Sequence, residues 1–473
     1  MAALSTTLEN KFEELEEAKQ TLQNSRPKIQ KVAEYLRNRE KFKKHYVPKL
    51  VSMGPIHHGN ENLELGEKYK LSWAAKYIEN TKLKPKDLFK RIADNIGNLK
   101  SLYAEEVLTL TSNKYPKGFD NEALCWMLFV DGCALLFILE KAKLEKAKDM
   151  NIKVDQLVLV MMDVLLLENQ LPYLVLKLLW KDEAEISLLS TMKNFLQCHH
   201  WSTPENKRRR QRTQGTTSDS VSNNKKGDQQ QHKVDVPDEP QPPTHLLDLQ
   251  RKIILPSKAK GNESNKKKVG VYKSWCKETH NIVEDKKNEM TTYRNIQELR
   301  AAGITLKSSK TRRPTDIEFY EGWFAATLVL PEIVVDDTTA ITFLNLIAYE
   351  MCPDFENDYG ICSFAVFMDS LIDHPDDVKE LRSQGILLNS LGSDKEVAKL
   401  FNILSTDLVA NTETYAEVRL KIHEHYLNRC KTWIALGFHT YFDNPWAIIA
   451  FLAAVFALVL TFIQTWYAIH PAC

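Results

Sequence analysis

Glycine-rich motifs, which mark many enzymes, are missing from this sequence. Glycine supplies only 16 of the 473 residues, and none of it forms a phosphate-binding loop or the sharp turn that carries a nucleophilic serine. A kinase catalytic loop and a zinc-binding pair of histidines on one helix are missing as well. We therefore expect a protein without catalytic activity and without a cofactor.

A strong charge of one sign is also missing. The chain has 63 basic and 62 acidic residues, so its formal net charge is +1. This balance gives no general attraction to nucleic acid, and we expect no nucleic-acid partner. With 43% hydrophobic residues, the chain can bury the cores of more than one domain.

The cysteines lack the two-residue spacing that is typical of zinc and redox sites. The eight residues are Cys125, Cys133, Cys198, Cys276, Cys352, Cys362, Cys430 and Cys473. The first residues of the chain do not combine a basic stretch with an apolar one, so they do not resemble a secretory signal. A single glycosylation sequon, at Asn262, gives no support to an exterior domain. We interpret the cysteines as reduced thiols of a chain that faces the cytosol.

The far end of the chain contains a long run without charged residues, Trp446 to Ile469. Since a helix of roughly 20 apolar residues spans the hydrocarbon of a bilayer, this run predicts one C-terminal transmembrane helix rather than a buried core helix. Pro445 suits the start of the helix. The aromatic residues that we expect to anchor it are Trp446, Phe451, Phe456, Phe462, Trp466 and Tyr467.

Only the segment His470–Cys473 follows this run. We therefore expect a single-pass protein that inserts after synthesis, with its large N-terminal domain in the cytosol and its short tail across the membrane. Arg429 and Lys431 precede the run, which agrees with the excess of positive charge on the cytosolic side. The plasma membrane is the expected location.

A second apolar run, Leu157–Trp180, contains polar residues. Asp163 alone costs about 2.5 to 3.5 kcal/mol near the centre of a membrane helix. Glu168, Pro172 and Lys177 add to that cost. We predict that this run is buried within the protein.

The first half of the chain is predicted to be helical. Residues 1–43 form an N-terminal segment with helical spacing of its apolar residues, either as a packed amphipathic helix or as a coiled-coil contact. These apolar residues are Phe12, Leu15, Leu22, Ile29, Val32, Tyr35 and Leu36. Residues 44–198 are predicted to form a helical bundle.

Residues 199–244 have the composition of a disordered linker, because they are polar, basic and poor in large apolar side chains. A second polar stretch, residues 257–270, extends this region. The basic cluster Lys207–Arg212 is compatible with a nuclear address, a contact for anionic lipid or a solvated run of charge.

Residues 245–438 are predicted to be helical with short strands. We expect two to four strands after Asn295, and Asp336, Asp337 and Thr338 can cap the helix that follows them. Ser393 and Glu396 have the spacing of a capping box, and Gly385 suits the end of a helix. The predicted fold is mainly α, a helical globular domain with a small β-sheet and one C-terminal transmembrane helix.

Three acidic residues in apolar surroundings, Asp131, Asp163 and Glu168, leave a hydrolase-type enzyme as an alternative. On a continuous helix, a five-residue step turns the chain by about 140°, so Asp163 and Glu168 would point in different directions. Buried acids more often bind caps and loop amides, which favours a structural role.

Histidine pairs are weak candidates for a metal site. His57 and His58 are adjacent, His199 and His200 follow Cys198, and His423 and His425 are two residues apart. None of these pairs has the spacing of four residues that places two ligands on one helical face. We therefore predict no metal.

Seven ordered motifs resemble the plant family known as domain of unknown function 247. They are "YVPKLVSMGPIHHG", "VDGCALLFIL", "DVLLLENQLPYLVL", "HLLDL", "ELRAAGI", "LVLPEIVVDDTT" and "YFDNPWAIIA", and they extend from about residue 27 to the end of the chain. Within them we single out Pro48, Gly54, Pro55, His57, His58, Gly59, Asp131, Gly132, Glu168, Asn169, Gln170, Pro172, Asp336, Asp337 and Pro445. Met53, Ile56 and Ala134 depart mildly from the family pattern.

The resemblance implies a membrane-associated plant protein without an established catalytic activity or cofactor. Some relatives in grasses are implicated in self-incompatibility, the rejection of self pollen. It also implies that Val51–Gly59 is a structural turn whose histidines hold a loop against the helical core. We expect an interaction or signalling protein in recognition, defence or development, with an unidentified protein partner. An extracellular receptor-like module is a further alternative.

Overall fold

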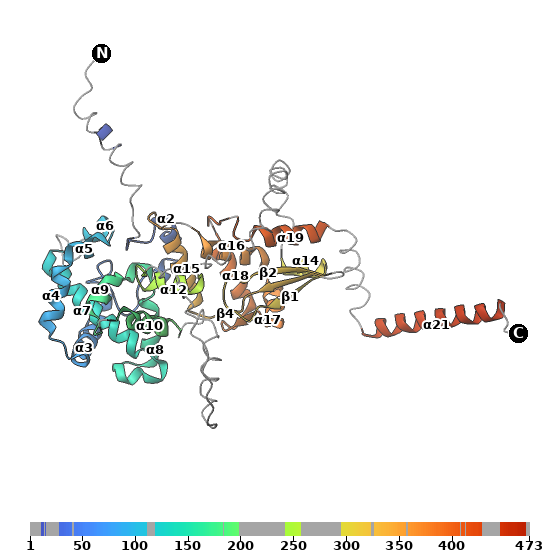
Figure 1. The fold of residues 1–473 in the computed structure, drawn as a ribbon, viewed down its shortest axis with the longest axis horizontal. Coiled ribbons are helices and arrows are strands. Elements are labelled where there is room, and N and C mark those ends of the chain that lie inside the picture. The colour runs from blue at the N-terminus through green and yellow to red at the C-terminus, as the bar shows by residue number, and fades with distance from the viewer. Residues whose placement is uncertain are drawn as a thin grey trace, which may run out of the picture. The chain divides into compact units, whose positions relative to one another are not determined.

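The computed structural model describes residues 11–13, 15, 28–39, 42–110, 119–182, 184–197, 242–256, 295–322, 326–355, 358–406, 408–411, 413–427 and 445–469. These residues are mainly helical, with five short strands among them (Figure 1). The chain divides into two compact units. Unit 1 contains residues 1–257 and 334–362, and unit 2 contains residues 258–333 and 363–473. This division differs from the predicted halves, because a late segment of the chain packs with the N-terminal residues.

Unit 1 is built from helices. They are α2 (Glu34–Arg37), η1 (Lys43–His45), η2 (Glu61–Leu63), α3 (Glu64–Thr81), α4 (Pro85–Asp94), α5 (Ile96–Ser101), α6 (Glu105–Leu108), α7 (Asn121–Lys141), η3 (Leu144–Met150), α8 (Val154–Asp163), η4 (Leu167–Asn169), α9 (Tyr173–Leu179), α10 (Glu185–Leu196), α12 (Leu246–Ile254) and α15 (Thr339–Glu350), where η marks a 3-10 helix. Helices α3, α4, α9 and α10 all pack against α7.

Helix α7 is the centre of this unit. The side chain of Asp120 accepts a hydrogen bond from the amide of Ala123 at 2.7 Å and so caps its first turn. Nearly all residues between Leu124 and Leu139 are buried, as expected for a helix that is apolar on every side. A Cβ atom on Gly132 would lie only 2.5 Å from Leu179, so this glycine lets α9 approach closely.

The second apolar run is bent rather than straight. Helix α8 and the segment η4–α9 meet at 98°, and the chain between them is irregular. Leu157, Val160, Val175 and Leu176 are all buried. The prediction that this run is buried within the protein is confirmed.

The predicted N-terminal helical segment is wrong over residues 28–33. These residues are not helical, and Ile29 forms an isolated parallel bridge with Tyr103, with its amide donating to the carbonyl of Leu102 at 2.9 Å. Ile29, Val32 and Leu36 are buried, so their spacing reflects burial of an extended segment and the short helix α2. Pairing with another segment outweighs local periodicity here.

Several predictions lie outside the described residues. They include the coiled coil, apart from residues 11–13 and 15, the linker up to residue 241 with its basic cluster, the sequon at Asn262, and the pair His199 and His200. Of the cysteines, Cys125, Cys133, Cys352 and Cys362 are described, and all four are buried free thiols.

Unit 2 contains a three-stranded sheet. Its central strand β3 (Ala326–Leu330) is parallel to β1 (Ile304–Ser308) and antiparallel to β2 (Glu318–Glu321). Strands β4 (Ile333–Val335), in which the chain passes from unit 2 to unit 1, and β5 (Leu387–Asn389) form a second sheet, and the amide of Ile333 donates to the carbonyl of Ile386. The helices are α14 (Ile296–Ala301), α16 (Gly360–Leu371), which crosses the boundary of the units, α17 (Pro375–Ser383), α18 (Asp394–Leu404), α19 (Ala416–Leu427) and α21 (Pro445–Ile469).

Of the strands, helix caps and helix end that local sequence patterns predicted after Asn295, some are present in the structure and others are not. The two to four strands predicted after Asn295 are present as β1 to β4, whereas the three-residue strand β5 was not predicted. Asp336 caps α15, since its Oδ1 accepts from the amides of Thr338 and Thr339 at 2.9 and 3.0 Å. The predicted capping box at Ser393 is wrong, because α18 begins there without a side-chain cap. Gly385 follows α17 with a positive φ of 65°, as predicted for a helix end.

Helix α21 is the other long apolar helix. Residues Ile449–Trp466 are long and apolar enough to cross a membrane, and none of this window is buried. Helix α7 meets the same test of length and composition, but 83% of its window is buried inside the protein. The described part of the chain therefore contains one exposed candidate for a membrane span.

Candidate functional site

The two adjacent histidines follow a loop that is held by buried side chains of unit 1. We call residues 49–54 the carboxylate-bound loop, because four of its six backbone amides donate to the carboxylates of Asp163 and Asp131. A fifth amide donates to the side-chain oxygen of Asn169. These acceptors come from the end of α8, from η4 and from α7. The loop therefore joins three helical segments.

Asp163 binds three consecutive amides of this loop. Its Oδ1 accepts from Lys49 at 2.9 Å, and its Oδ2 accepts from Leu50 at 2.7 Å and from Val51 at 2.9 Å. Burial raises the pKa of Asp163, whereas the three amide donors favour the carboxylate and oppose that rise. This side chain fastens the loop to the end of α8.

Asn169 and Asp131 bind the second half of the loop. The Oδ1 of Asn169 accepts from the amide of Met53 at 2.6 Å, and its Nδ2 donates to the carbonyl of Val51 at 3.0 Å. Asp131 accepts from the amide of Gly54 at 2.9 Å. Buried backbone groups that have no partner in a helix or sheet thus find one in a side chain.

Two glycines allow the loop to pass close to its neighbours. Gly54 has a positive φ of 74°, and a Cβ there would lie 3.0 Å from the carbonyl oxygen of Gln170. Gly66, in α3, faces the loop even more closely, because a Cβ would lie 1.8 Å from the carbonyl oxygen of Leu50. Any side chain at position 66 must displace the backbone of the loop.

Beneath the loop, Lys70 of α3 is fully buried between acidic residues. Its Nζ lies 2.6 Å from Asp131 and 2.9 Å from Glu67, and it donates to Ser52 at 3.3 Å. Burial lowers the pKa of Lys70, but the attraction of Asp131 and Glu67 outweighs burial, so the pKa of Lys70 is raised, while burial raises the pKa of Asp131 despite the attraction of Lys70. The ion pair between Lys70 and Asp131 joins α3 to α7.

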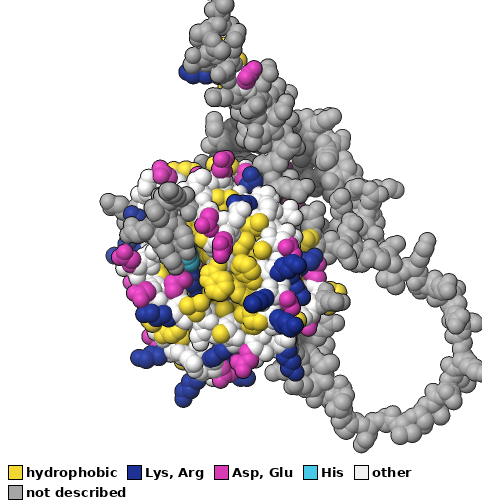
Figure 2. Space-filling view, turned by 90° about the vertical axis from the view of Figure 1, so that its left-hand side faces the viewer, with side chains coloured by type: hydrophobic (Ala, Val, Ile, Leu, Met, Phe, Trp, Pro, Cys, Tyr) yellow, Lys and Arg dark blue, Asp and Glu magenta, His cyan; other side chains and the backbone are white. Residues whose placement is uncertain are grey.

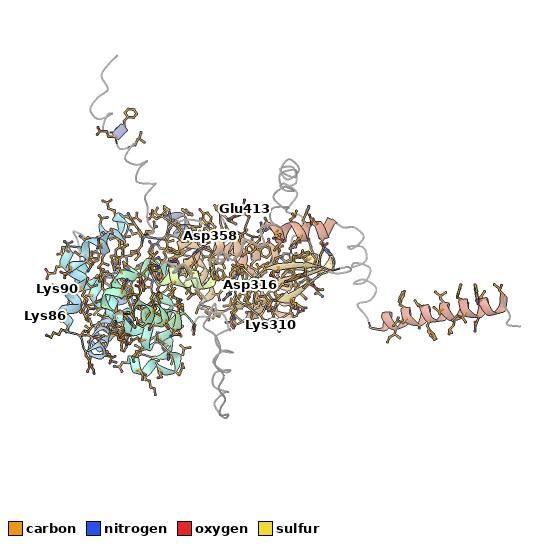
Figure 3. All side chains as sticks on the ribbon, viewed as in Figure 1. Lys86, Lys90, Lys310, Asp316, Asp358 and Glu413 are labelled. Carbon is orange, nitrogen blue, oxygen red and sulfur yellow. The ribbon has the colours of Figure 1, made fainter. Side chains whose placement is uncertain are left out.

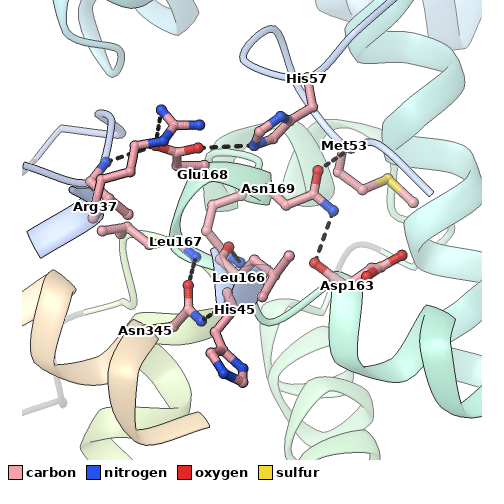
Figure 4. A network of polar contacts seen from close by, with 12 residues as sticks. Arg37, His45, Met53, His57, Asp163, Leu166, Leu167, Glu168, Asn169 and Asn345 are labelled. Carbon is pink, nitrogen blue, oxygen red and sulfur yellow. Dashed lines mark hydrogen bonds and ion pairs between the residues drawn. The ribbon is translucent and has the colours of Figure 1, made fainter. Parts of the chain in front are cut away.

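On the other side of the loop, Glu168 collects contacts from three segments (Figure 4). Its Oε1 accepts from the amide of Val32 at 3.0 Å and from Arg37 at 3.3 Å, and its Oε2 lies 2.9 Å from Nε2 of His57. Glu168 therefore binds the extended N-terminal segment to the loop with the histidines. It is fully buried, which strengthens these polar contacts.

Helix α15 joins the same network from far along the chain (Figure 4). The Oδ1 of Asn345 accepts from the amide of Leu167 at 2.9 Å, and its Nδ2 donates to the carbonyl of His45 at 2.9 Å. Asn345 is fully buried. This contact is one of those that join residues 334–362 to unit 1.

The histidine motif opens onto the surface as a hollow of about 380 Å³. The hollow is lined by Ile56, His57, His58, Gly59, Asn60, Glu61 and Asn62. His57 is mostly buried and turned toward Glu168, whereas the ring of His58 lies 5.8 Å from that of Phe119. Among the described residues, no group of three or more histidine, cysteine or acidic side chains could hold a metal ion.

Most of the family-motif residues lie together in this site. Gly54 ends the carboxylate-bound loop, Pro55 follows it, and His57, His58 and Gly59 line the hollow. Asp131, Glu168, Asn169 and Gln170 lie at or next to the contacts of these residues. Gln170 bonds the carbonyls of Val164 and Leu166 and the amide of Leu247, and Pro172 precedes α9. Asp336 and Asp337 lie apart, before α15, and the backbone of Pro445 begins α21.

Lys70, Gly66 and Asn345 were not among the residues predicted from the sequence. The signal for Lys70 was its position on the same helical face as Trp73, Ala74 and Tyr77, all of which are buried. A lysine on a buried face needs an acidic partner, and Asp131 supplies it. The contact of Asn345 spans 178 residues in the sequence, so no local pattern marks it.

The arrangement is better suited to holding chain segments than to chemistry. The oxygens of Asp163 and Asp131 are bonded to loop amides and to Lys70, and Asp131 and Lys70 are 1% and 0% exposed. Asp163 and Glu168 do not share a binding partner among the bonds that the structure shows. The hollow at residues 56–62 is accessible from the surface.

Comparisons with known proteins agree with this pattern of motifs. The model of a family described as "Plant protein of unknown function" matches residues 29–460. UPF0481 protein At3g47200 of Arabidopsis thaliana is 27% identical over 438 residues, which cover 90% of this chain and 83% of that protein. Putative UPF0481 protein At3g02645 of the same plant is 25% identical over 468 residues, covering 89% of this chain and 86% of that protein. No solved structure matches.

Proposed function

Since the chain belongs to this family of plant proteins, DUF247, we propose that it is an interaction or signalling protein without catalytic activity, anchored in the plasma membrane by α21. Its large N-terminal part faces the cytosol in this proposal. The site of action is a surface of the helical domain, and the partner is another protein. The biological setting is recognition, as in self-incompatibility, defence or development.

The exposed apolar helix α21 carries this proposal. No residue of Ile449–Trp466 is buried, so the helix has no protein cover among the described residues. Leaving such a surface in water is costly, at about 25 cal/mol per Å² of apolar area. A bilayer covers it, and the length of the helix matches the hydrocarbon thickness.

The buried polar network supports a binding role rather than catalysis. A catalytic acid needs an oxygen that can reach a substrate. The candidate acids Asp131, Asp163 and Glu168 instead bind amides, Lys70, Arg37 and His57 inside unit 1. A hydrolase that uses them is the rival hypothesis.

Protease protection on sealed plant microsomes tests the anchor and its orientation. The full chain carries one tag at Met1 and another after Cys473. We expect protease to remove the first tag and to spare the second. Protection of the first tag contradicts the cytosolic orientation and favours the receptor-like alternative.

A matched variant tests whether α21 inserts. Leu458 lies in the exposed window of α21, and Leu458→Arg costs about 2.5 to 3.5 kcal/mol near the centre of a membrane helix. We expect it to make the chain extractable by alkaline carbonate, whereas Leu458→Ile leaves the chain in the membrane pellet. If the wild-type chain is itself extracted by carbonate, α21 is not a membrane span.

A further inference from the structure

Helix α4, the turn that precedes it and the start of α7 carry basic side chains and an exposed tryptophan. We call Lys82, Lys84, Lys86, Phe89, Lys90 and Trp126 the basic aromatic face. Trp126 is 54% exposed, yet its ring is supported by Phe89 at 6.3 Å and Phe129 at 5.7 Å. Lys86 and Lys90 project outward from α4 (Figure 3).

This face concentrates positive charge in a chain that is nearly neutral. Residues 82–91 contain five basic side chains and one acidic side chain, a formal charge of +4, whereas the whole chain has +1. Lys82, Lys84, Lys86 and Lys90 are exposed, and none of these four makes an ion pair with another described residue. Arg91 differs, since it donates to the carbonyl of Leu178.

Acidic side chains are also present near this face. Asp87 and Asp94 lie on α4, and Asp120 and Glu122 lie at the start of α7, where Asp120 caps the helix. Seen from this side, hydrophobic side chains gather in the middle, Lys and Arg side chains stand beside them, and acidic side chains lie next to the hydrophobic centre, among the basic side chains and at the rim (Figure 2). The aromatic centre and its lysines thus form one accessible surface.

We propose that the basic aromatic face docks onto an anionic lipid surface. Tryptophan prefers the headgroup layer, where its ring is partly in hydrocarbon and its N–H is in a polar environment. Lysines attract anionic lipids within about a Debye length. A membrane span in the same chain keeps the face near a bilayer, so that weak contacts add up through a high effective concentration.

This inference rests on the proposed function, because α21 supplies the tether, and it deepens it. Anionic lipids are abundant in the cytosolic leaflet of a membrane. Docking of this face therefore fixes which surface of unit 1 is hidden and which is presented to a partner.

The test is lysine footprinting of the full chain in lipid nanodiscs. The protein is placed in discs of neutral phosphatidylcholine or of phosphatidylcholine with about 30% phosphatidylserine, which gives a strong negative surface potential. A neutral amine-reactive reagent labels the lysines, and mass spectrometry gives the rate at each one. We expect labelling of Lys82, Lys84, Lys86 and Lys90 to slow by roughly fivefold or more in the anionic discs and to recover at high salt.

The same molecule contains a matched control. Lys141, Lys143, Lys146 and Lys148 are equally exposed, but residues 140–149 contain four basic and three acidic side chains, a formal charge of +1. Their labelling should be the same in both kinds of disc. Trp126→Ala should reduce the protection of the four face lysines, and Leu144→Ala, at an exposed leucine elsewhere in unit 1, should not.

Three results overturn the inference. The first is that the face lysines are labelled at the same rate in neutral and anionic discs. The second is that the control lysines are protected in anionic discs as strongly as the face lysines. The third is that a soluble acidic peptide protects the face lysines in neutral discs, whereas anionic discs alone do not protect them. The last result assigns the face to an acidic protein instead. A chain that fails to stay with neutral discs during gel filtration contradicts the anchor itself, so failure of the proposed function is recognised separately.

Discussion

Helices α7 and α21 are both long and apolar enough to cross a membrane, yet one is buried in protein and the other is exposed. Helix α7 carries Asp131, which is paired with Lys70, and its first turn is capped by Asp120. The run Trp446–Ile469 of α21 has no charged residue. An apolar sequence shows only that a helix must be shielded from water, by protein or by lipid. A buried charge that is paired with a residue of another helix shows that protein shields it.

The comparison can be tested first at the buried charge of α7. Lys70→Met removes the positive partner and leaves Asp131 buried without it, so we expect the unfolding free energy of unit 1 to fall by about 3 to 5 kcal/mol. Urea titration of the full chain in a mild detergent, followed by near-ultraviolet circular dichroism, measures the loss.

A second variant separates lost packing from an unpaired charge. Lys70→Met combined with Asp131→Leu replaces the ion pair by apolar side chains, and most of the lost stability should return. The amide of Gly54 then lacks its acceptor, which costs about 1 to 3 kcal/mol and keeps the recovery incomplete. If the double variant is as unstable as the single one, the unpaired charge of Asp131 is not the cause of the lost stability.

Acidification sharpens the comparison because unit 1 buries titratable groups and the exposed window of α21 has none. Burial lowers the pKa of His245 from 6.5 to about 4, despite the opposing attraction of Asp248. Between these two pH values, the folded unit binds fewer protons at His245 than the unfolded chain does. The contribution of His245 to the unfolding free energy is therefore fully present above pH 6.5 and is lost as the pH falls toward 4. At about 1.4 kcal/mol per pKa unit, this amounts to about 3 kcal/mol.

His245→Asn isolates this contribution. The ring accepts from the amide of Asp248 as the cap of α12, and asparagine keeps a cap acceptor but does not titrate. Unfolding free energies measured from pH 7 to pH 4 should decline less steeply in the variant. Part of the slope should persist, because burial also lowers the pKa of His45 to about 4. An unchanged slope excludes His245 as its source.

The smallest effects come from glycines next to this core. Gly97, in α5, has open space where a side-chain methyl group would lie, so Gly97→Ala should stabilise unit 1 by about 0.5 to 1 kcal/mol. Gly66→Ala has the same helical preference but collides with the carbonyl of Leu50, and it should destabilise the unit instead. Thermal unfolding of the two variants side by side decides the sign, and stabilisation by both would show that the carboxylate-bound loop moves freely.

Sequence patterns predicted the features that depend on composition. The apolar character of α21 and the burial of the bent run through α8 and α9 follow from counting charged and apolar side chains. The mainly helical fold and strands β1 to β4 follow from periodicity and turn residues. The family motifs also located the loop, since Gly54, His57 and Asp131 belong to them and lie at its contacts.

Pairings between distant segments could not be predicted in the same way. The extended stretch at residues 28–33 is fixed by Tyr103 and Glu168, and nothing in its own spacing distinguishes it from a helix. The packing of α15 against η1 and η4 in unit 1, to which Asn345 contributes, joins segments that are far apart in the sequence. Strand β5 has three residues, too few for a periodic signal.

The carboxylate-bound loop has a consequence for how the chain folds. Its amides bond to side chains that lie 77 to 116 residues away in the sequence. Contacts across such separations form only after the intervening chain has been organised, and they slow folding. The loop, and with it the hollow of the two histidines, should be among the last parts of unit 1 to acquire its native shape. During synthesis, the ribosome must therefore release residue 163 before residue 49 can reach its native position, and residue 169 before residue 53 can do so.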